Sequence, residues 1–346
     1  MTIKTAILGY GRSGSTLHAD PLEELKDEFT VTAICDIDAD ARKKAKDRFG
    51  CVIYDDYQEM LEKEDLDLVV IVTRSDQHCE MTCDCLRGGT NVLVTKPWAV
   101  NAAEARRMIA ASEESGNTLL PWLPARWGCD LVRLKDIIAS GVIGKVFMVR
   151  RREFSFGIRT DWQTRKTYGG GYLLNWGPHI IDQAIQLVGE KVAGVCGQLR
   201  QIINPGDVED VFHAVLTTES GVILSCEYTI AIDKLPNWVI QGDRGTIFVK
   251  EKSVEVHHVD IPDEIDPSAY RNQPEITVTR EELDGEHRIT MSSRYGDPFV
   301  IYPEIAKALR GEADYPVTTA SALKLTQVLD AVRESSETGR TIQLTG

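Results

Sequence analysis

The chain has 346 residues, of which 42% are hydrophobic, and this indicates a globular protein of about two domains. Its formal charge of −14 argues against nucleic acid or an anionic membrane surface as its target, because both are polyanions. The sequence contains no apolar run long enough to span a bilayer and no signal-peptide pattern, so we expect a cytoplasmic protein without nucleic-acid or membrane partners.

The most informative stretch is the start of the chain. Residues 5–8 (Thr-Ala-Ile-Leu) predict a short buried strand, and a glycine-rich turn follows at once. A strand that runs through G-x-G-x-x-G into a helix is typical of a dinucleotide-binding turn. Glycine permits the tight turn, the approach of a pyrophosphate and close helix packing, while the helix N-terminus attracts phosphate. We therefore predict cofactor contacts from Gly9, Tyr10, Gly11, Arg12, Ser13 and Gly14.

The first third of the chain alternates short apolar strands with helices. We expect strands at 31–35, 67–72, 91–94 and 118–123, and helices at 40–49, 78–86 and from a cap at Asn101 to Gly116. This repetition predicts a parallel, doubly wound sheet in a dinucleotide-binding domain of residues 1–123.

The pattern changes after residue 124, where longer strands begin. Apolar and polar residues alternate over 222–230, which marks a strand with one apolar face, and Ser220-Gly221 predicts a hairpin with the strand before it. We expect this second domain, 124–346, to be α+β with a mostly antiparallel sheet. Its other predicted elements are a helix at 130–140, strands at 211–218, 237–241 and 246–250, a long loop region at 262–296, and a helix that ends at Gly339.

Asp36 stands at the end of the second predicted strand. An acid there can accept hydrogen bonds from the ribose hydroxyls of an adenosine and would repel a 2′-phosphate. Ile37 follows, where an arginine would suit NADP, so we expect NAD. Arg42, Lys43 and Lys44 keep NADP open. The alternative for Asp36 is a helix or turn cap.

Lys96 and Pro97 follow the strand at 91–94. The carboxyl ends of parallel strands form the ligand crevice of a doubly wound sheet, so we expect Lys96 to project toward the cofactor. Proline restrains the residue before it to extended backbone, which holds Lys96 in place. A solvated lysine is the alternative.

Three glycines at 169–171 precede a stretch that contains Asn175 and His179. Such glycines allow a close approach of the backbone to a ligand. Pro178 favours the first turn of a helix, so we expect His179 in that turn and Asn175 just before it. A neutral imidazole can accept the proton of a bound alcohol near neutral pH. A buried histidine with satisfied hydrogen bonds is the alternative.

The cysteines of the first domain include one cluster, Cys79, Cys83 and Cys85, with His78 beside it. Its spacing matches no standard zinc pattern. We expect these thiols to be reduced and buried against the sheet, with no metal.

Several motifs occur in the order typical of one family, and the chain resembles the glucose–fructose oxidoreductase and inositol dehydrogenase (Gfo/Idh/MocA) family over essentially its whole length. The resemblance is carried by the turn at 9–14, Asp36, Val70-Ile-Val-Thr73 with His78, Lys96-Pro97, Arg126-Trp127, residues 140–146, Asp161-Trp162, the glycines at 169–171, His179, Asp182 and Pro316-Val-Thr.

The resemblance implies a Rossmann domain followed by a domain with a large open sheet, which commonly mediates homodimers or homotetramers. It also implies hydride transfer between nicotinamide and a secondary hydroxyl of a sugar, glycoside or cyclitol. The catalytic lysine of the family and its aspartate–histidine pair map onto Lys96, Asn175 and His179. Further cofactor contacts are expected from Thr73, Arg74, His78, Lys96 and Pro97, and substrate contacts from Arg126, Asp161, Trp162, Tyr168, Asn175 and His179.

The chain departs from the family where Asn175 replaces the aspartate. An asparagine can hydrogen-bond a hydroxyl but cannot take up its proton. The proton transfer would then fall to His179, with Lys96 stabilising the developing alkoxide and Asp182 either orienting His179 or serving the structure. Arg74 stands where the family usually has proline. Two alternative functions share the fold: a redox-neutral enzyme that holds NAD tightly for glycoside cleavage or sugar–sugar hydride exchange, and a non-enzymatic regulator that binds NAD or a sugar.

Overall fold

The computed structural model describes residues 2–261, 267–269, 274–283 and 294–344. The chain forms two compact units, and each is continuous in space but not in sequence. The first unit consists of Met1–Pro124, Arg165–Gly170 and Asp297–Gln327, and the second of Ala125–Thr164, Gly171–Gly296 and Val328–Gly346. The first unit therefore includes two segments that the sequence analysis places in the domain 124–346.

The first unit contains a parallel sheet of six strands in the order β3-β2-β1-β4-β5-β6. The strands are β1 (Ile3–Leu8), β2 (Phe29–Cys35), β3 (Val52–Tyr54), β4 (Leu68–Ile71), β5 (Asn91–Val94) and β6 (Leu119–Pro121). The strand order reverses between β1 and β4, so the carboxyl ends of these two strands are where a doubly wound sheet binds its ligand. The predicted Rossmann-like sheet is confirmed.

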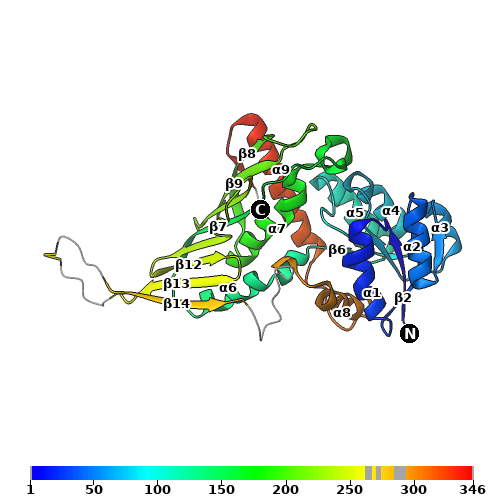
Figure 1. The fold of residues 1–346 in the computed structure, drawn as a ribbon, viewed down its shortest axis with the longest axis horizontal. Coiled ribbons are helices and arrows are strands. Elements are labelled where there is room, and N and C mark those ends of the chain that lie inside the picture. The colour runs from blue at the N-terminus through cyan, green and yellow to red at the C-terminus, as the bar shows by residue number, and fades with distance from the viewer. Residues whose placement is uncertain (1, 262–266, 270–273, 284–293, 345–346) are drawn as a thin grey trace. The chain divides into compact units, whose positions relative to one another are not determined.

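Helices connect these strands (Figure 1). They are the π-helical turn η1 (Gly14–His18), α1 (Ala19–Glu24), α2 (Ala39–Phe49), α3 (Tyr57–Lys63), η2 (Ser75–Gln77), α4 (His78–Arg87) and α5 (Ala102–Ser115). The later segments of this unit add η5 (Lys166–Tyr168) and α8 (Pro298–Leu309). The predicted cap of α5 is confirmed, because Oδ1 of Asn101 accepts a hydrogen bond from the backbone N–H of Glu104 at 2.9 Å. Gly116 ends the helix with a φ of 73°.

The second unit contains a sheet of nine strands in the order β14-β13-β12-β11-β7-β10-β9-β8-β15. The strands are β7 (Val146–Phe154), β8 (Val192–Arg200), β9 (Val211–Thr218), β10 (Ile223–Thr229), β11 (Trp238–Gly242), β12 (Gly245–Lys250), β13 (Ser253–Val259), β14 (Ile276–Glu282) and β15 (Ile342–Gln343). Only β7 and β10 pair in parallel among these neighbours, so the expectation of a mostly antiparallel sheet is confirmed.

One face of this sheet is covered by α7 (Tyr172–Val188), which lies against β7 and β10 (Figure 1). The side chains of Leu224, Cys226 and Tyr228 on β10 are buried, whereas the residues between them are only half-buried, as the alternating pattern predicts. Further helices of the chain are η3 (Pro124–Trp127), α6 (Cys129–Ala139), η4 (Trp162–Thr164) and α9 (Thr319–Thr338), and the boundary between the two units divides α9.

The long loop expected at 262–296 is wrong in part, because β14 lies within it and pairs with β13. This edge strand is exposed over nearly all of its length, so it has no buried face to produce an apolar alternation in the sequence. Residues 262–266, 270–273 and 284–293 of the predicted loop lie outside the described residues. In the part of the chain that the structure describes, we find no helix with the length and apolar character that a membrane span requires.

Candidate functional site

The turn after β1 combines a tightly packed glycine with an open one. The backbone N–H of Gly9 donates to the carbonyl oxygen of Cys35 at 2.8 Å, which joins the turn to β2. A Cβ atom on Gly14 would lie 2.0 Å from the carbonyl oxygen of Gly9, so only glycine fits there. A Cβ on Gly11 would meet no heavy atom within 4 Å. Packing therefore explains Gly14, whereas the open space at Gly11 fits the room that a cofactor pyrophosphate needs beside a helix N-terminus.

The carboxylate of Asp36 accepts two backbone hydrogen bonds at the end of β2. Its Oδ2 accepts from the N–H of Tyr10 at 2.6 Å, and its Oδ1 accepts from the N–H of Asp38 at 2.8 Å. Asp36 thus acts as a turn cap, which was the alternative to ribose binding. The two roles are compatible, because an ionised carboxylate has about four acceptor positions and the backbone uses two of them.

The guanidinium group of Arg42 contacts oxygen atoms of the protein. Its Nη1 donates to the carbonyl oxygens of Asp36 at 2.7 Å and Ile37 at 3.0 Å, and its Nη2 lies 3.8 Å from a carboxylate oxygen of Asp55. The neighbouring Lys43 and Lys44 are exposed to solvent on α2. The Nη1 group of Arg42 is therefore committed to backbone carbonyl oxygens beside Asp36.

A buried imidazole connects the loops after β4 and β5. Nδ1 of His78 lies 2.8 Å from the carbonyl oxygen of Pro97, and its Nε2 lies 3.1 Å from that of Thr73. Burial lowers the pKa of His78, and the two carbonyl groups oppose that shift. His78 thereby holds Pro97, and with it the half-buried Lys96, next to the end of β4. The peptide bond between Lys96 and Pro97 is cis.

The segment 165–170 brings Tyr168 to the first unit, where it meets Arg74. The guanidinium carbon of Arg74 lies 4.1 Å from the centre of the Tyr168 ring, and its Nε lies 3.4 Å from Oδ1 of Asp76. A Cβ on Gly169 would lie 2.9 Å from Cβ of Ser75. A cofactor candidate and a substrate candidate of the sequence analysis are therefore in contact, through a stacked cation–π pair.

Helix α7 begins earlier than the sequence suggests. It starts at Tyr172, so Pro178 lies in its interior and the expectation of Pro178 in the first turn is wrong. Glu209, from a segment distant in sequence, organises the start: its Oε1 accepts from the N–H of Leu173 at 2.9 Å. A Cβ on Gly171 would lie 2.4 Å from the same oxygen. The acceptor for the helix start comes from the fold, so no local cap residue marks it in the sequence.

The early start places Asn175 and His179 one helical turn apart on α7, on one face of the helix. His179 is 7% exposed. Its ring centre lies 6.0 Å from that of Trp176 and 5.2 Å from that of Tyr295. Trp176 in turn stacks on Tyr228 with their ring centres 5.1 Å apart. These aromatic neighbours of His179 could not be predicted from the sequence, because Tyr228 and Tyr295 come from distant parts of the chain.

Arg126 and Asp182 form a bidentate ion pair, in which Nε and Nη2 of the arginine donate to the two carboxylate oxygens at 2.8 and 2.9 Å. The Asp182 side chain is 1% exposed. Of the two roles left open for Asp182, this pairing supports the structural one. Asp161 accepts in a similar way from Arg159, at 2.7 and 2.9 Å, and Trp162 follows it in η4.

The predicted thiol burial is confirmed, since Cys79, Cys83 and Cys85 are all buried within α4. The expected packing against the sheet is wrong for two of them, because Cys79 and Cys83 point their Sγ atoms toward carbonyl oxygens of α5. Among the residues described by the structure, no group of three His, Cys, Asp or Glu side chains is arranged to hold a metal ion.

The site residues predicted from the sequence are distributed over both units. The first unit holds the turn at 9–14, Asp36, the residues after β4 and β5, and Tyr168. The second holds Arg126, Asp161, Trp162, Asn175 and His179.

Two family models match the chain. Residues 3–121 match an oxidoreductase family with an NAD-binding Rossmann fold, and residues 131–248 match the GFO/IDH/MocA C-terminal domain. The chain is similar to scyllo-inositol 2-dehydrogenase (NADP(+)) IolW of Bacillus subtilis, with 28% identity over 355 residues that cover 99% of this chain and 96% of that enzyme.

Solved structures with the same fold cover nearly the whole chain. An NAD-binding protein from Listeria innocua is 25% identical, with a TM-score of 0.84 over 99% of this chain and 97% of that one. The WlbA dehydrogenase from Bordetella pertussis, solved in complex with NADH and UDP-GlcNAcA, is 22% identical, with a TM-score of 0.81 over 100% of this chain and 99% of that one.

Proposed function

This chain belongs to the Gfo/Idh/MocA family of oxidoreductases, and from that membership we propose that it is an NAD-dependent dehydrogenase of a sugar, glycoside or cyclitol. The proposal rests on α7, where Asn175 and the buried His179 lie one turn apart. The other unit has the open turn at Gly11, which leaves room for a cofactor pyrophosphate. The secondary hydroxyl is oxidised to a ketone in the forward direction, and the reverse reaction reduces the ketone.

When bound, NAD supplies a hydride acceptor at nicotinamide C4. His179 accepts the proton of the substrate hydroxyl while the carbon that bears this hydroxyl gives up a hydride. The ammonium group of Lys96 stabilises the negative charge that develops on the oxygen. Asn175 donates a hydrogen bond to the same oxygen and leaves the proton to His179. We propose further substrate contacts from Arg126, Asp161, Trp162 and Tyr168.

The contacts around Asp36 support NAD over NADP. A 2′-phosphate would face the Asp36 carboxylate, and Arg42 already donates to the carbonyl oxygens of Asp36 and Ile37. The name of the Bacillus subtilis relative gives NADP as its cofactor. Comparing kcat/KM for the two cofactors tests this part of the proposal, and a preference for NADP would contradict it.

We also propose that two or four copies assemble through the nine-stranded sheet, because its residues alternate between a buried face against α7 and a half-buried face. Analytical ultracentrifugation of the purified protein tests this, and a monomer at micromolar concentration would refute it.

A screen of sugars, glycosides and inositols with NAD and NADP, followed by the absorbance of the reduced cofactor, tests the activity. We expect His179→Ala and Lys96→Ala to abolish turnover while NAD still binds, as isothermal titration would measure. Lys135→Ala is a matched control for the lysine, because it removes an exposed lysine elsewhere, on α6. Full activity of both site variants would refute the assignment. NAD that co-purifies without net reduction would favour the redox-neutral alternative, and the absence of any turnover would favour the regulator.

A further inference from the structure

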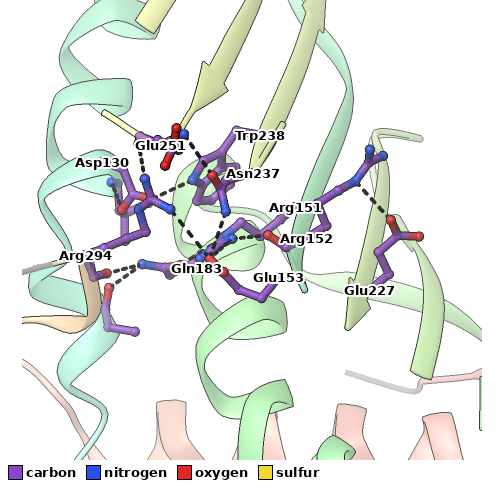
Figure 2. Close-up of polar contacts among 12 residues, drawn as sticks. Asp130, Arg151, Arg152, Glu153, Gln183, Glu227, Asn237, Trp238, Glu251 and Arg294 are labelled. Atoms are coloured by element: carbon purple, nitrogen blue, oxygen red, sulfur yellow. Dashed lines mark hydrogen bonds and ion pairs between the residues drawn. The ribbon is translucent and has the colours of Figure 1, made fainter. Parts of the chain in front are cut away.

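A buried ionic cluster lies beside the middle of α7 (Figure 2). Its two guanidinium groups and two carboxylates have formal charges that cancel, and they belong to Arg151, Arg294, Asp130 and Glu153. Nη1 of Arg151 lies 2.7 Å from Oε1 of Glu153, and Nε of Arg294 lies 3.4 Å from Oδ2 of Asp130. Transfer of each ion out of water costs several kcal/mol, so stability alone is a weak reason to bury such a cluster. A better-attested role of a buried ionic cluster is to fix the register of the segments that it joins.

Arg294 is held in this cluster by both its side chain and its backbone. Its Nη2 donates to the carbonyl oxygen of Glu251, and its Nη1 lies 3.9 Å from Oε1 of Glu153. Its own carbonyl oxygen accepts from Nε2 of Gln183 at 3.1 Å, and the oxygen of the same Gln183 amide accepts from Nε of Arg151 at 2.9 Å. The contacts with Gln183 fix residue 294 relative to α7 (Figure 2). Gln183 lies one turn after His179 on that helix.

Tyr295 extends from this anchor to the aromatic rings of α7. Its ring centre lies 5.2 Å from that of His179 and 5.6 Å from that of Trp176, with interplanar angles of 53° and 64°. The rings of Trp176 and His179 are themselves 6.0 Å apart, so each of the three rings contacts the other two. Burial, and then the negative charge of Glu153, raises the pKa of Tyr295, while Arg151 and Arg294 oppose that shift. The phenol therefore keeps its proton near neutral pH.

We propose that Tyr295 is a positioning residue for His179 and that the ionic cluster is the anchor that holds Tyr295 in place. The proposal rests on the proposed function, because it takes His179 as the proton acceptor. A general base must lie within about 3 Å of the proton that it removes. The ring contacts of Tyr295 and Trp176 restrict the orientations of the imidazole, and a misplacement of about 1 Å can reduce the rate about 100-fold.

Two substitutions separate the ring of Tyr295 from its hydroxyl. Tyr295→Leu removes the ring, and we expect kcat to fall about 10- to 100-fold with KM within about threefold of the original. Tyr295→Phe keeps the ring, and we expect kcat within about threefold. Phe49→Leu is the matched control, because it removes a half-buried ring of α2 in the first unit, on which the guanidinium of Arg48 packs at 5.1 Å. Thermal melting verifies that all three variants are folded.

A second measurement needs neither NAD nor turnover. In the cofactor-free protein, the ring resonances of His179, assigned by comparison with His179→Ala, are followed against pH by NMR. We expect Tyr295→Leu to move the His179 titration to higher pH, because water reaching the ring favours the charged form. Phe49→Leu leaves this titration unchanged.

The outcomes distinguish the two proposals. If His179→Ala is inactive but Tyr295→Leu has the original kcat and an unchanged His179 titration, only the role of Tyr295 is refuted. If His179→Ala keeps full activity, the proposed function falls and the role of Tyr295 falls with it. A loss of kcat in Tyr295→Leu together with a shifted titration supports the positioning role.

Discussion

The two units hold their candidate residues in different ways. In the first unit, the turn at 9–14 is shaped by its own backbone and by the adjoining ends of β2 and β4, and Asp36 caps it from the next strand. In the second unit, α7 is held by side chains from distant segments: Glu209 at its start, and Arg294 with Tyr295 along its length. The first arrangement depends on backbone geometry that a small number of contiguous residues specify. The second depends on side-chain contacts between residues far apart in the sequence.

This difference has a practical consequence for substitutions. A side chain added at Gly14 meets backbone atoms that cannot move away, so its effect should stay within the first unit. Loss of one member of the ionic cluster leaves charged partners buried without their counterion, and its effect should spread along α7 to His179.

The largest effect is expected from Arg294→Ala. This change leaves Asp130 and Glu153 with Arg151 as the one remaining arginine of the cluster, and breaking a buried pair costs about 3–5 kcal/mol. Urea unfolding measures the loss, and hydrogen exchange should show faster exchange in α7 than in β1 and β4. Equal changes in both units would contradict the contrast.

A comparison of Gly14→Ala with Gly11→Ala tests the turn. The added Cβ at residue 14 would lie 2.0 Å from a carbonyl oxygen, so we expect a loss of about 3 kcal/mol or more in the free energy of unfolding. Gly11→Ala meets no protein atom, so the protein should fold normally and lose NAD affinity by about tenfold or more, which isothermal titration would measure. Unchanged NAD affinity in folded Gly11→Ala would show that the open space is not the pyrophosphate site.

The pH dependence of stability should reflect His18, which lies fully buried in η1 with its Nδ1 2.8 Å from the hydroxyl of Tyr302. Burial lowers the pKa of His18 to about 3 from an ordinary value of 6.5. Between these values the unfolded chain binds a proton that the folded chain does not, so stability is complete above pH 6.5 and is lost as the pH falls toward 3, at about 1.4 kcal/mol per pH unit. His78, whose pKa is also lowered, contributes in the same direction.

His18→Gln removes this proton while an amide oxygen or nitrogen can still pair with Tyr302. Urea unfolding at pH 7 and at pH 5.5 should show a smaller pH dependence in the variant than in the original protein. An identical slope in the two proteins would rule out His18 as the source.

The smallest effect is expected from Glu209→Ala, which removes the acceptor for the N–H of Leu173 at the start of α7. Loss of a helix cap costs about 1 kcal/mol. Glu209→Gln retains an acceptor oxygen and should recover part of this loss. Urea unfolding measures the free energy of unfolding of both variants. Equal destabilisation of the two would show that the hydrogen bond to Leu173 is not how the Glu209 carboxylate stabilises the protein.

Local patterns in the sequence determined much of the fold. The strands at 31–35, 91–94 and 211–218, the cap at Asn101 and the hairpin at Ser220-Gly221 could all be predicted, because each depends on neighbouring residues or on the period of the apolar positions. The family could be identified for the same reason, since its motifs are short and contiguous.

Only the tertiary structure decided where α7 begins, and therefore that Asn175 and His179 share a helical face. Pro178 suggests a helix start to any local rule, but Glu209 and Gly171 place the start six residues earlier. Tyr295 reaches His179 through an anchor at Arg294 that no periodic pattern reveals. The physical reason is that backbone conformation is governed by near neighbours, whereas the partners of a buried charge or ring are chosen by the packing of the whole unit.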